Sequence, residues 1–213
     1  MELYGYWRSS AAYRVRIALN LKGLEVQHQF VNLREDEQRS ESYRRMNALG
    51  RVPTLVDGGQ AFTQSLAILE YLNERYPKPP MLPEGAIERA RVRALAQVVA
   101  CDIHPINNIS VFIYLENELK VETDKRTAWY RHWIATGFTA LETMLADDPR
   151  TGRYCHGDMP SLADLCLVPQ VYNARRFECD LAPYPAIVRI DAACAQLDAF
   201  RQAAPEAQPD AQN

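Results

Sequence analysis

Residues Tyr6–Gly23, YWRSSAAYRVRIALNLKG, contain two adjacent serines where a predicted strand is followed by a predicted helix. Apolar residues recur at helical spacing after the serines, so we expect a helix that begins at Ser9 or Ser10 and ends at Gly23. The free backbone N–H groups and the positive dipole end of a helix N-terminus stabilise an anion. The sequence therefore predicts an anion site at the serine pair, with a thiolate as the anion.

The first 80 residues predict the order β-α-β-α-β-β-α. Besides the helix after the serines, the expected elements are strands over residues 2–6, 26–33, 51–56 and 60–63, a short helix over 41–46, and a helix that follows Gln64-Ser65. The proline-rich segment Pro77–Pro83 cannot continue a helix and is typical of a linker. We therefore expect an α/β domain over residues 1–80.

Beyond the linker the pattern is helical, and no segment has strand periodicity. Helices are expected over residues 86–120, 124–146, 161–177 and 186–203, which together form an all-helical bundle domain over 86–204. Ser161 and Asp164 match a capping box, so we interpret Asp164 as a cap rather than as a catalytic acid. The polar residues 205–213 are expected to form a loose tail.

Composition excludes several functional classes. The chain has 213 residues with 24 Lys and Arg against 27 Asp and Glu, a net charge of −3, which does not favour binding to nucleic acid or anionic lipid. No apolar run reaches the length of a membrane helix, and the N-terminus does not resemble a secretory signal. The five cysteines lack a C-x-x-C pair, so we expect reduced thiols, no metal site and a cytoplasmic protein.

A strand edge and two helix starts suggest the ligand. Pro53 interrupts a strand-like run, and a cis peptide bond there exposes the backbone of Val52 to pair with an extended peptide. Helix starts at the serine pair and at Gln64-Ser65 suit two anionic groups, which lie on either side of that edge. Glutathione has this shape.

Four motifs carry a resemblance to a known family. They are SSAAYRVRIAL at Ser9–Leu19, RVPTL at Arg51–Leu55, QSLAILEYL at Gln64–Leu72, and CDIHPINN at Cys101–Asn108. Together they resemble the zeta class of glutathione transferases, and more narrowly the bacterial maleylacetoacetate and maleylpyruvate isomerases, over nearly the whole chain. The resemblance implies a thioredoxin-like N-terminal domain, a helical C-terminal domain and a homodimer.

The resemblance also implies a set of residues that bind glutathione. Ser9, assisted by Ser10, would hydrogen-bond the sulfur and favour its thiolate, and Val52 would pair with the cysteinyl backbone. Gln64 and Ser65 would hold the γ-glutamyl group, Gln38 the glycine end, and Asp102 and His104 would lie by the cleft, in their own or in the partner subunit. Ala11 replaces the cysteine that many members carry, so bound glutathione is the expected nucleophile.

The implied reaction is a cis–trans isomerisation of a small diketo dicarboxylic acid in aromatic catabolism. Addition of the thiolate to the cis double bond would permit rotation, and its expulsion would restore a trans double bond without consuming glutathione. Arg8 and Arg176 are expected to bind the substrate carboxylates, and Asn108 a substrate oxygen. Arg14 and Arg16 are interpreted as ion-pair or dimer-surface residues.

Two alternatives remain open from the sequence. The same thiolate could conjugate electrophiles or α-halo acids in a transferase, and the fold could serve as a glutathione-binding module without catalysis. Maleylacetoacetate and maleylpyruvate differ only in chain length, which the depth of the pocket would sense, so the sequence does not separate them.

Overall fold

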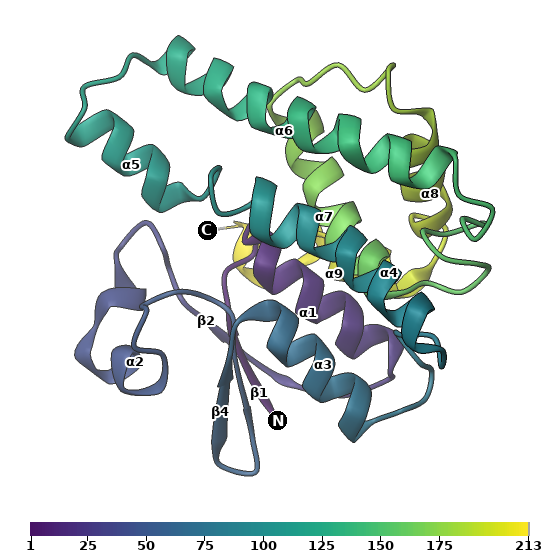
Figure 1. Cartoon of the computed structure of the whole chain (residues 1–213). Coiled ribbons are helices and arrows are strands. Elements are labelled where there is room, and N and C mark those ends of the chain that lie inside the picture. Colours follow the sequence, from purple (N-terminus) through teal and green to yellow (C-terminus); the bar gives the residue numbers. More distant parts are fainter. Residues whose placement is uncertain (213) are drawn as a thin grey trace. The chain divides into compact units, whose positions relative to one another are not determined.

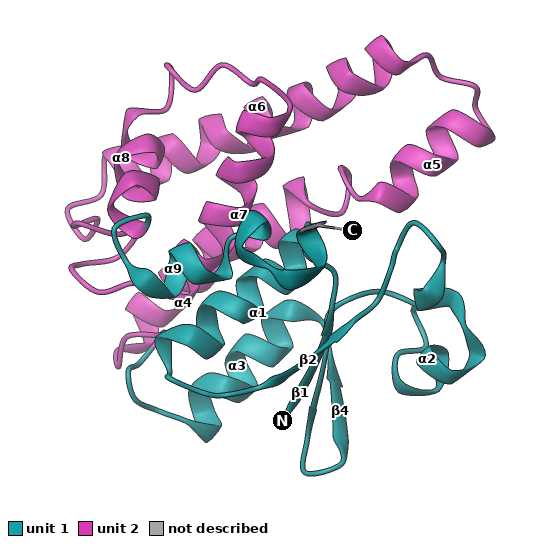
Figure 2. Cartoon of the chain, turned by 180° about the vertical axis from the view of Figure 1, so that it is seen from behind, with its two compact units in different colours: residues 1–80, 195–213 teal, residues 81–194 magenta. Residues whose placement is uncertain are grey.

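The chain folds into two compact units in this computed structural model, which describes residues 1–212 (Figure 1). The first unit joins residues 1–80 to the C-terminal segment from Ala195, and the second unit is Met81–Cys194 (Figure 2). The N-terminal part of the first unit thus ends at Pro80, inside the proline-rich segment Pro77–Pro83. The C-terminal segment differs from the expected continuation of the helical domain, because it packs with the first unit.

The first unit is built on a mixed sheet with the order β2-β1-β3-β4. Its strands are β1 (Glu2–Gly5), β2 (Gln27–Phe30), β3 (Thr54–Asp57) and β4 (Gln60–Thr63). β1 pairs with β2 in parallel and with β3 antiparallel, and β3 pairs antiparallel with β4 through the tight turn at Gly58-Gly59. Both turn glycines have positive φ, which a two-residue hairpin turn requires.

Helices cover both sides of this sheet. Figure 1 shows α1 (Ser10–Leu21) and α3 (Ser65–Arg75) together on one side and α2 (Glu41–Met46), which follows the 3-10 turn η1 (Glu37–Arg39), on the other. Leu3 and Leu55 of the sheet and Ile17, Ile68 and Leu72 of the helices are fully buried. Each such side chain contributes about 1.5–3 kcal/mol on burial. The predicted β-α-β-α-β-β-α order and thioredoxin-like fold are confirmed.

The C-terminal segment packs on α1 instead of forming the loose tail that we expected. It contains α9 (Asp198–Ala203) and the 3-10 turns η3 (Pro205–Ala207) and η4 (Pro209–Gln212). Phe200 and Ala203 are buried, and the amide of Asn20 on α1 donates to the carbonyl of Ala199 at 3.0 Å. The polar composition misled the prediction because polar groups here bond to backbone: Gln208 Nε2 donates to the carbonyls of Gln202 and Ala204, each at 2.9 Å.

The second unit is helical, as predicted. Its elements are α4 (Ala86–Gln97), the π-helical turn η2 (Val98–Ile103), α5 (Ile109–Asn117), α6 (Thr123–Ala146), α7 (Leu162–Arg176) and α8 (Pro185–Cys194). Gly137 on α6 lets Ile103 approach closely, since a Cβ there would lie 2.3 Å from the Ile103 side chain. In the part of the chain that the structure describes, no helix has the length and hydropathy needed to cross a membrane.

Two of the predicted long helices are interrupted. The helix expected over residues 86–120 changes to π-helical turns at Val98 and stops before Asn108, which caps α5 by accepting the backbone N–H of Ser110 at 3.0 Å. Pro105 lies in the interruption and has no N–H to continue the helical ladder. The helix expected over 186–203 divides into α8 and α9, which belong to different units.

Asp164 closes a buried capping box at the start of α7. Its Oδ2 accepts the backbone N–H of Ser161 at 2.7 Å and the Ser161 hydroxyl at 2.8 Å, while its Oδ1 accepts the backbone N–H of Cys155 at 2.8 Å. Burial raises the pKa of the Asp164 carboxyl, and these hydrogen bonds oppose that rise. The interpretation of Asp164 as a cap agrees with this geometry.

The Asp164 carboxylate is therefore expected to stabilise the second unit. Asp164→Ala leaves the backbone N–H groups of Ser161 and Cys155 buried without an acceptor, so the free energy of unfolding should fall by about 3 kcal/mol. Asp158→Ala is the control, because this exposed carboxylate accepts the N–H of Arg153 at 3.2 Å and its loss should cost less than about 1 kcal/mol. Urea denaturation measures both, and equal losses would contradict the role of Asp164.

Candidate active site

Ser9 caps the N-terminus of α1. Its backbone N–H donates to the carbonyl of Tyr6 at 3.0 Å, which closes a turn, and its Oγ accepts the backbone N–H of Ala12 at 3.2 Å. Because the oxygen accepts from the helix, the hydroxyl hydrogen is left to donate to a group outside it. Ser10 is the first residue of α1 and is buried. The helix end and the Ser9 hydroxyl can together stabilise an anion.

Arg8 lies directly before Ser9 and packs on an aromatic ring. Its guanidinium carbon lies 5.0 Å from the centre of the Trp7 ring, in a cation–π contact. A guanidinium that stacks by its face keeps its edge N–H groups for hydrogen bonds, and two of those match a carboxylate. That Arg8 binds a substrate carboxylate stays a prediction.

Gln64 and Ser65 form the start of α3. Gln64 has φ 67° and ψ 114°, a backbone conformation that costs about 1–3 kcal/mol for a residue other than glycine and is concentrated at functional sites. The Ser65 hydroxyl is buried and accepts a hydrogen bond from Nη1 of Arg14 at 3.1 Å. Nε and Nη2 of this buried guanidinium have no hydrogen-bond partner within residues 1–212. A positive charge thus lies behind the Ser65 hydroxyl.

The segment before β3 is held by two side chains from the α2 region. The carbonyl of Arg51 accepts from the Tyr43 hydroxyl at 2.8 Å and from the Asn47 amide at 2.7 Å. Val52 follows, and the Val52–Pro53 peptide is cis. β3 begins only at Thr54, so Val52 lies beyond the strand ladder that the sequence had extended to it. Its backbone is available for an extended ligand.

Gln38 lies in η1, close to this segment. A Cβ at Gly50 would lie 2.9 Å from the Gln38 carbonyl oxygen, and Gly50 has φ +57°, so only glycine suits this approach. The Gln38 amide donates to Asp36 at 3.1 Å, and its Oε1 is buried without a partner among the described residues. An unsatisfied buried carbonyl of this kind can accept from a ligand N–H.

Three of the expected site residues lie in the interrupted region between α4 and α5. Asp102 is an exposed residue of the π-helical turn η2, and His104 ends that turn. Asn108 caps α5, and its Oδ1 accepts both the backbone N–H and the hydroxyl of Ser110. Single π-helical turns within helices are frequent at functional sites. All three residues belong to the second unit.

Arg176 lies at the end of α7 beside a cluster of aromatic rings. Its guanidinium carbon lies 4.7 Å from the centre of the Phe177 ring, and the Phe177 ring stacks on that of Tyr130 at 3.7 Å. Burial raises the pKa of Tyr130 to about 12, while the charge of Arg176 and a hydrogen bond from it oppose that rise. Like Arg8, this exposed arginine is supported by an aromatic face.

The protein-family model of the glutathione S-transferase N-terminal domain matches residues 1–74 of the chain. The chain is 51% identical over 210 residues to a maleylpyruvate isomerase from a Ralstonia species, with 99% of each chain covered. A holo structure of maleyl pyruvate isomerase, a bacterial zeta-class glutathione S-transferase, is 51% identical with a TM-score of 0.97 and 99% coverage of both chains. The chain belongs to the zeta class of glutathione transferases.

A further solved structure adds ligands to the comparison. It is a maleylacetoacetate isomerase from Methylobacterium extorquens AM1 with bound malonate and GSH, 43% identical with a TM-score of 0.95 and 98% coverage of both chains. The resemblance predicted from the four sequence motifs is confirmed. The roles of the individual site residues remain predictions.

Two arginines of α1 in this zeta-class chain contradict one of the two roles expected for them, that of dimer-surface residues. Arg14 and Arg16 are 2% and 4% exposed, so neither lies on a dimer surface. Arg14 donates to a hydroxyl, whereas the Arg16 guanidinium donates to backbone carbonyls of Ala203, Tyr6 and Trp7 at 3.0, 3.5 and 2.9 Å. Their burial depends on contacts with residues far away in sequence, Ser65 of α3 for Arg14 and Ala203 of α9 for Arg16, which local periodicity does not reveal.

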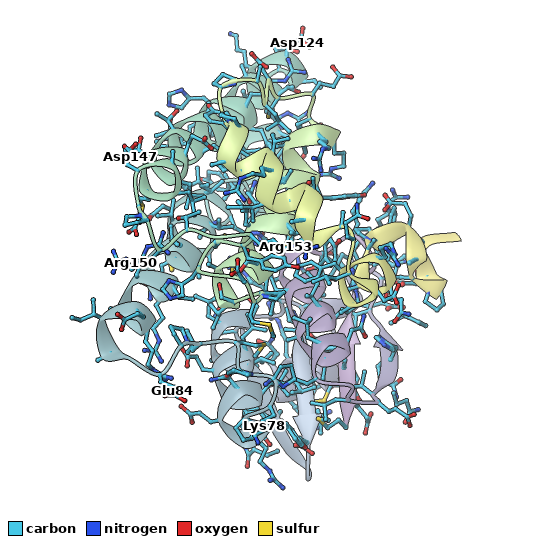
Figure 3. The ribbon with its side chains drawn as sticks, turned by 90° about the vertical axis from the view of Figure 1, so that its right-hand side faces the viewer. Lys78, Glu84, Asp124, Asp147, Arg150 and Arg153 are labelled. Carbon is cyan, nitrogen blue, oxygen red and sulfur yellow. The ribbon has the colours of Figure 1, made fainter. Side chains whose placement is uncertain are left out.

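The second unit has a surface hollow of about 560 Å³. It is formed at the end of α6 and in the loop that follows, where Asp147 and Arg150 lie (Figure 3). Asp148 in this loop pairs with Arg91 at 2.8 Å and with Arg150 at 2.6 Å, and these contacts hold its pKa well below the usual range. None of the predicted site residues lines this hollow.

Proposed function

We propose that this zeta-class protein is a glutathione-dependent cis–trans isomerase of maleylacetoacetate or maleylpyruvate in the breakdown of aromatic compounds. The observation that carries the proposal is the Ser9 hydroxyl at the N-terminus of α1, which accepts from Ala12 and keeps its hydrogen to donate. The full-length similarity to a maleylpyruvate isomerase supports the same substrate class.

The polar groups of the first unit fit glutathione. The Ser9 hydroxyl suits the sulfur, with Ser10 beside it at the helix start, and the backbone of Val52 suits the cysteinyl peptide. The unsatisfied Oε1 of Gln38 can accept from the glycyl N–H. The first unit thus offers a hydroxyl donor for the thiol of a short peptide. It also offers a free strand end and an acceptor without a partner for the backbone of that peptide.

The γ-glutamyl end would be held at the start of α3. Gln64 and Ser65 would bind its charged groups there, and the Arg14 charge behind Ser65 favours the carboxylate. Asp102 and His104 of the second unit complete the proposed set; a carboxylate suits the glutamyl ammonium group, and His104 suits a backbone oxygen.

When bound, glutathione supplies a sulfur nucleophile that adds reversibly to the substrate double bond and is regenerated. The Ser9 hydroxyl and the α1 dipole lower the free energy of the thiolate before the reaction. Ala11 places no thiol of the protein at this position. The role of the first unit is therefore to hold and ionise a single sulfur.

Arg8 and Arg176 would bind the two substrate carboxylates. Each stacks on an aromatic ring and keeps its edge for bidentate hydrogen bonds, and each cation also offsets negative charge that develops on the substrate carbonyls. The amide of Asn108 would donate to a substrate oxygen. The similar maleylacetoacetate isomerase that holds malonate together with GSH supports a dicarboxylic acid as the substrate.

The proposed function is tested by an absorbance assay of both maleyl acids with and without glutathione. At least one acid should turn over only when glutathione is present, with the glutathione concentration unchanged at the end. Turnover without glutathione would overturn the proposed mechanism. Loss of glutathione with formation of a conjugate would instead indicate the transferase alternative.

Replacement of the two stacked arginines should weaken turnover of the diacid. Arg8→Met and Arg176→Met should each lower kcat/KM for it roughly 10- to 100-fold and change glutathione affinity less than about twofold. Arg175→Met is a matched control, because this neighbouring arginine pairs with Asp191 at 2.6 Å. An equal loss in the Arg175 variant, or none in the other two, would contradict the carboxylate roles.

We also propose a homodimer. Several large apolar side chains of the second unit are exposed in the single chain, among them Ile109, Tyr114 and Trp129. Sedimentation equilibrium should give twice the 24.3 kDa mass of one chain. A mass of one chain at micromolar concentration would rule the homodimer out.

A cytoplasmic location is proposed on the state of the cysteines. Cys101, Cys155, Cys166, Cys179 and Cys194 are all free thiols, and burial raises the pKa of Cys155 and Cys194. A reducing compartment preserves such thiols and supplies reduced glutathione. Cell fractionation tests the proposal, and recovery outside the cytoplasm would contradict it.

A further inference from the structure

The turn that carries Arg8 and Ser9 is held from within the first unit by a buried arginine. Arg16 on α1 donates to the carbonyl of Trp7 at 2.9 Å and lies 3.5 Å from that of Tyr6. The Tyr6 carbonyl also accepts the backbone N–H of Ser9 at 3.0 Å. The guanidinium therefore fixes the two peptide groups that immediately precede Arg8.

The C-terminal segment holds the same turn from its other side. The backbone N–H of Trp7 donates to Oδ2 of Asp210 at 2.8 Å, across 203 positions of sequence. The Trp7 ring in turn supports the Arg8 guanidinium at 5.0 Å. Asp210 thus accepts from the backbone N–H of Trp7, and Arg16 donates to the backbone carbonyl of Trp7. A rotation of the turn would break both hydrogen bonds.

Arg16 also ties the turn to α9. Its Nε donates to the carbonyl of Ala203 at 3.0 Å, at the end of that helix. Burial lowers the pKa of Arg16 to about 10, and the negative charge of Asp210 opposes the lowering. Arg16 therefore remains charged near neutral pH, and it and Asp210 form one cluster around the Trp7 backbone.

We infer that Arg16 and Asp210 are positioning residues for the turn that carries Ser9. This inference rests on the proposed function, because it assigns to the C-terminal segment the task of orienting the groups that ionise the sulfur and bind the diacid. The proposed glutathione contacts at Val52 and Ser65 lie on other elements and do not depend on this turn. Loss of the hydrogen bonds that Arg16 and Asp210 make with the turn should therefore affect turnover more than glutathione binding.

The variants Asp210→Ala and Asp210→Asn separate this role from general stability. Asp210→Ala removes the acceptor for the Trp7 N–H, so kcat should fall roughly fivefold and the KM for the diacid should rise, with the KM for glutathione within about twofold of wild type. Asp210→Asn keeps an oxygen acceptor and should restore most of kcat. A chain that ends after Gln208 should behave as Asp210→Ala.

Asp198→Ala is the matched control, because Asp198 lies in the same segment and its carboxylate pairs with Arg201 on the surface. It should leave kcat and both KM values unchanged. All assays are made at 25 °C, with thermal unfolding recorded for each variant. A role in stability alone would lower the unfolding midpoint and leave the kinetic constants of the folded protein unchanged.

Amide hydrogen exchange supplies a readout that does not need activity. The peptide containing Trp7 and Ser9 should exchange faster in Asp210→Ala than in wild type or Asp198→Ala. Wild-type exchange and kinetics in Asp210→Ala would overturn the inference and leave the proposed function intact. Faster exchange without a change in kcat would also overturn it. If the wild-type enzyme lacks glutathione-dependent turnover, the proposed function fails, and the exchange data alone then decide whether Asp210 holds the turn.

Discussion

The unpaired backbone N–H groups at the start of α1 are the constraint on which the proposed chemistry depends. Ser9 satisfies one of them through its Oγ, which fixes the oxygen and directs the hydroxyl hydrogen away from the helix. The neighbouring elements of the first unit then supply a strand end at Val52 and a second helix start at Ser65. A single peptide ligand with a sulfur in its centre can use all three.

Arginine has two distinct uses in this chain. The buried Arg14 and Arg16 act on other protein groups, one through the Ser65 hydroxyl and the other through backbone carbonyls. Arg8 and Arg176 instead lie over aromatic rings, with the guanidinium carbons 5.0 and 4.7 Å from the ring centres. We propose that the buried pair positions other groups of the site and that the stacked pair binds the substrate.

Local patterns predicted the first unit well. Helix caps, the hairpin glycines and apolar periodicity gave the element order, since each is set by residues close in sequence. The predicted cap at Ser9 and the expected cis peptide at Val52–Pro53 are both present. The motif resemblance further gave the family, which composition alone could not have done.

The structural predictions that were wrong failed mainly because of contacts between residues far apart in sequence. The tail seemed loose because its residues are polar, yet Gln208 and Asp210 bond to backbone groups, one of them 203 positions away. Arg16 is buried because a covering helix, α9, comes from the far end of the sequence. Pro105 indicated the helix break near Asn108, but the helical periodicity on both sides of it favoured one continuous helix.

The central claim is that the Ser9 hydroxyl stabilises a glutathione thiolate, and ultraviolet titration of the bound thiol tests it most directly. The account predicts a pKa below the ordinary thiol value of about 8.5, raised by about one unit in Ser9→Ala. Ser40→Ala is the control, because Ser40 caps α2 in the same way, with its Oγ 3.3 Å from the N–H of Tyr43. It should leave the thiol pKa unchanged. An unshifted pKa in the wild-type protein, or the same pKa in Ser9→Ala, would contradict the account.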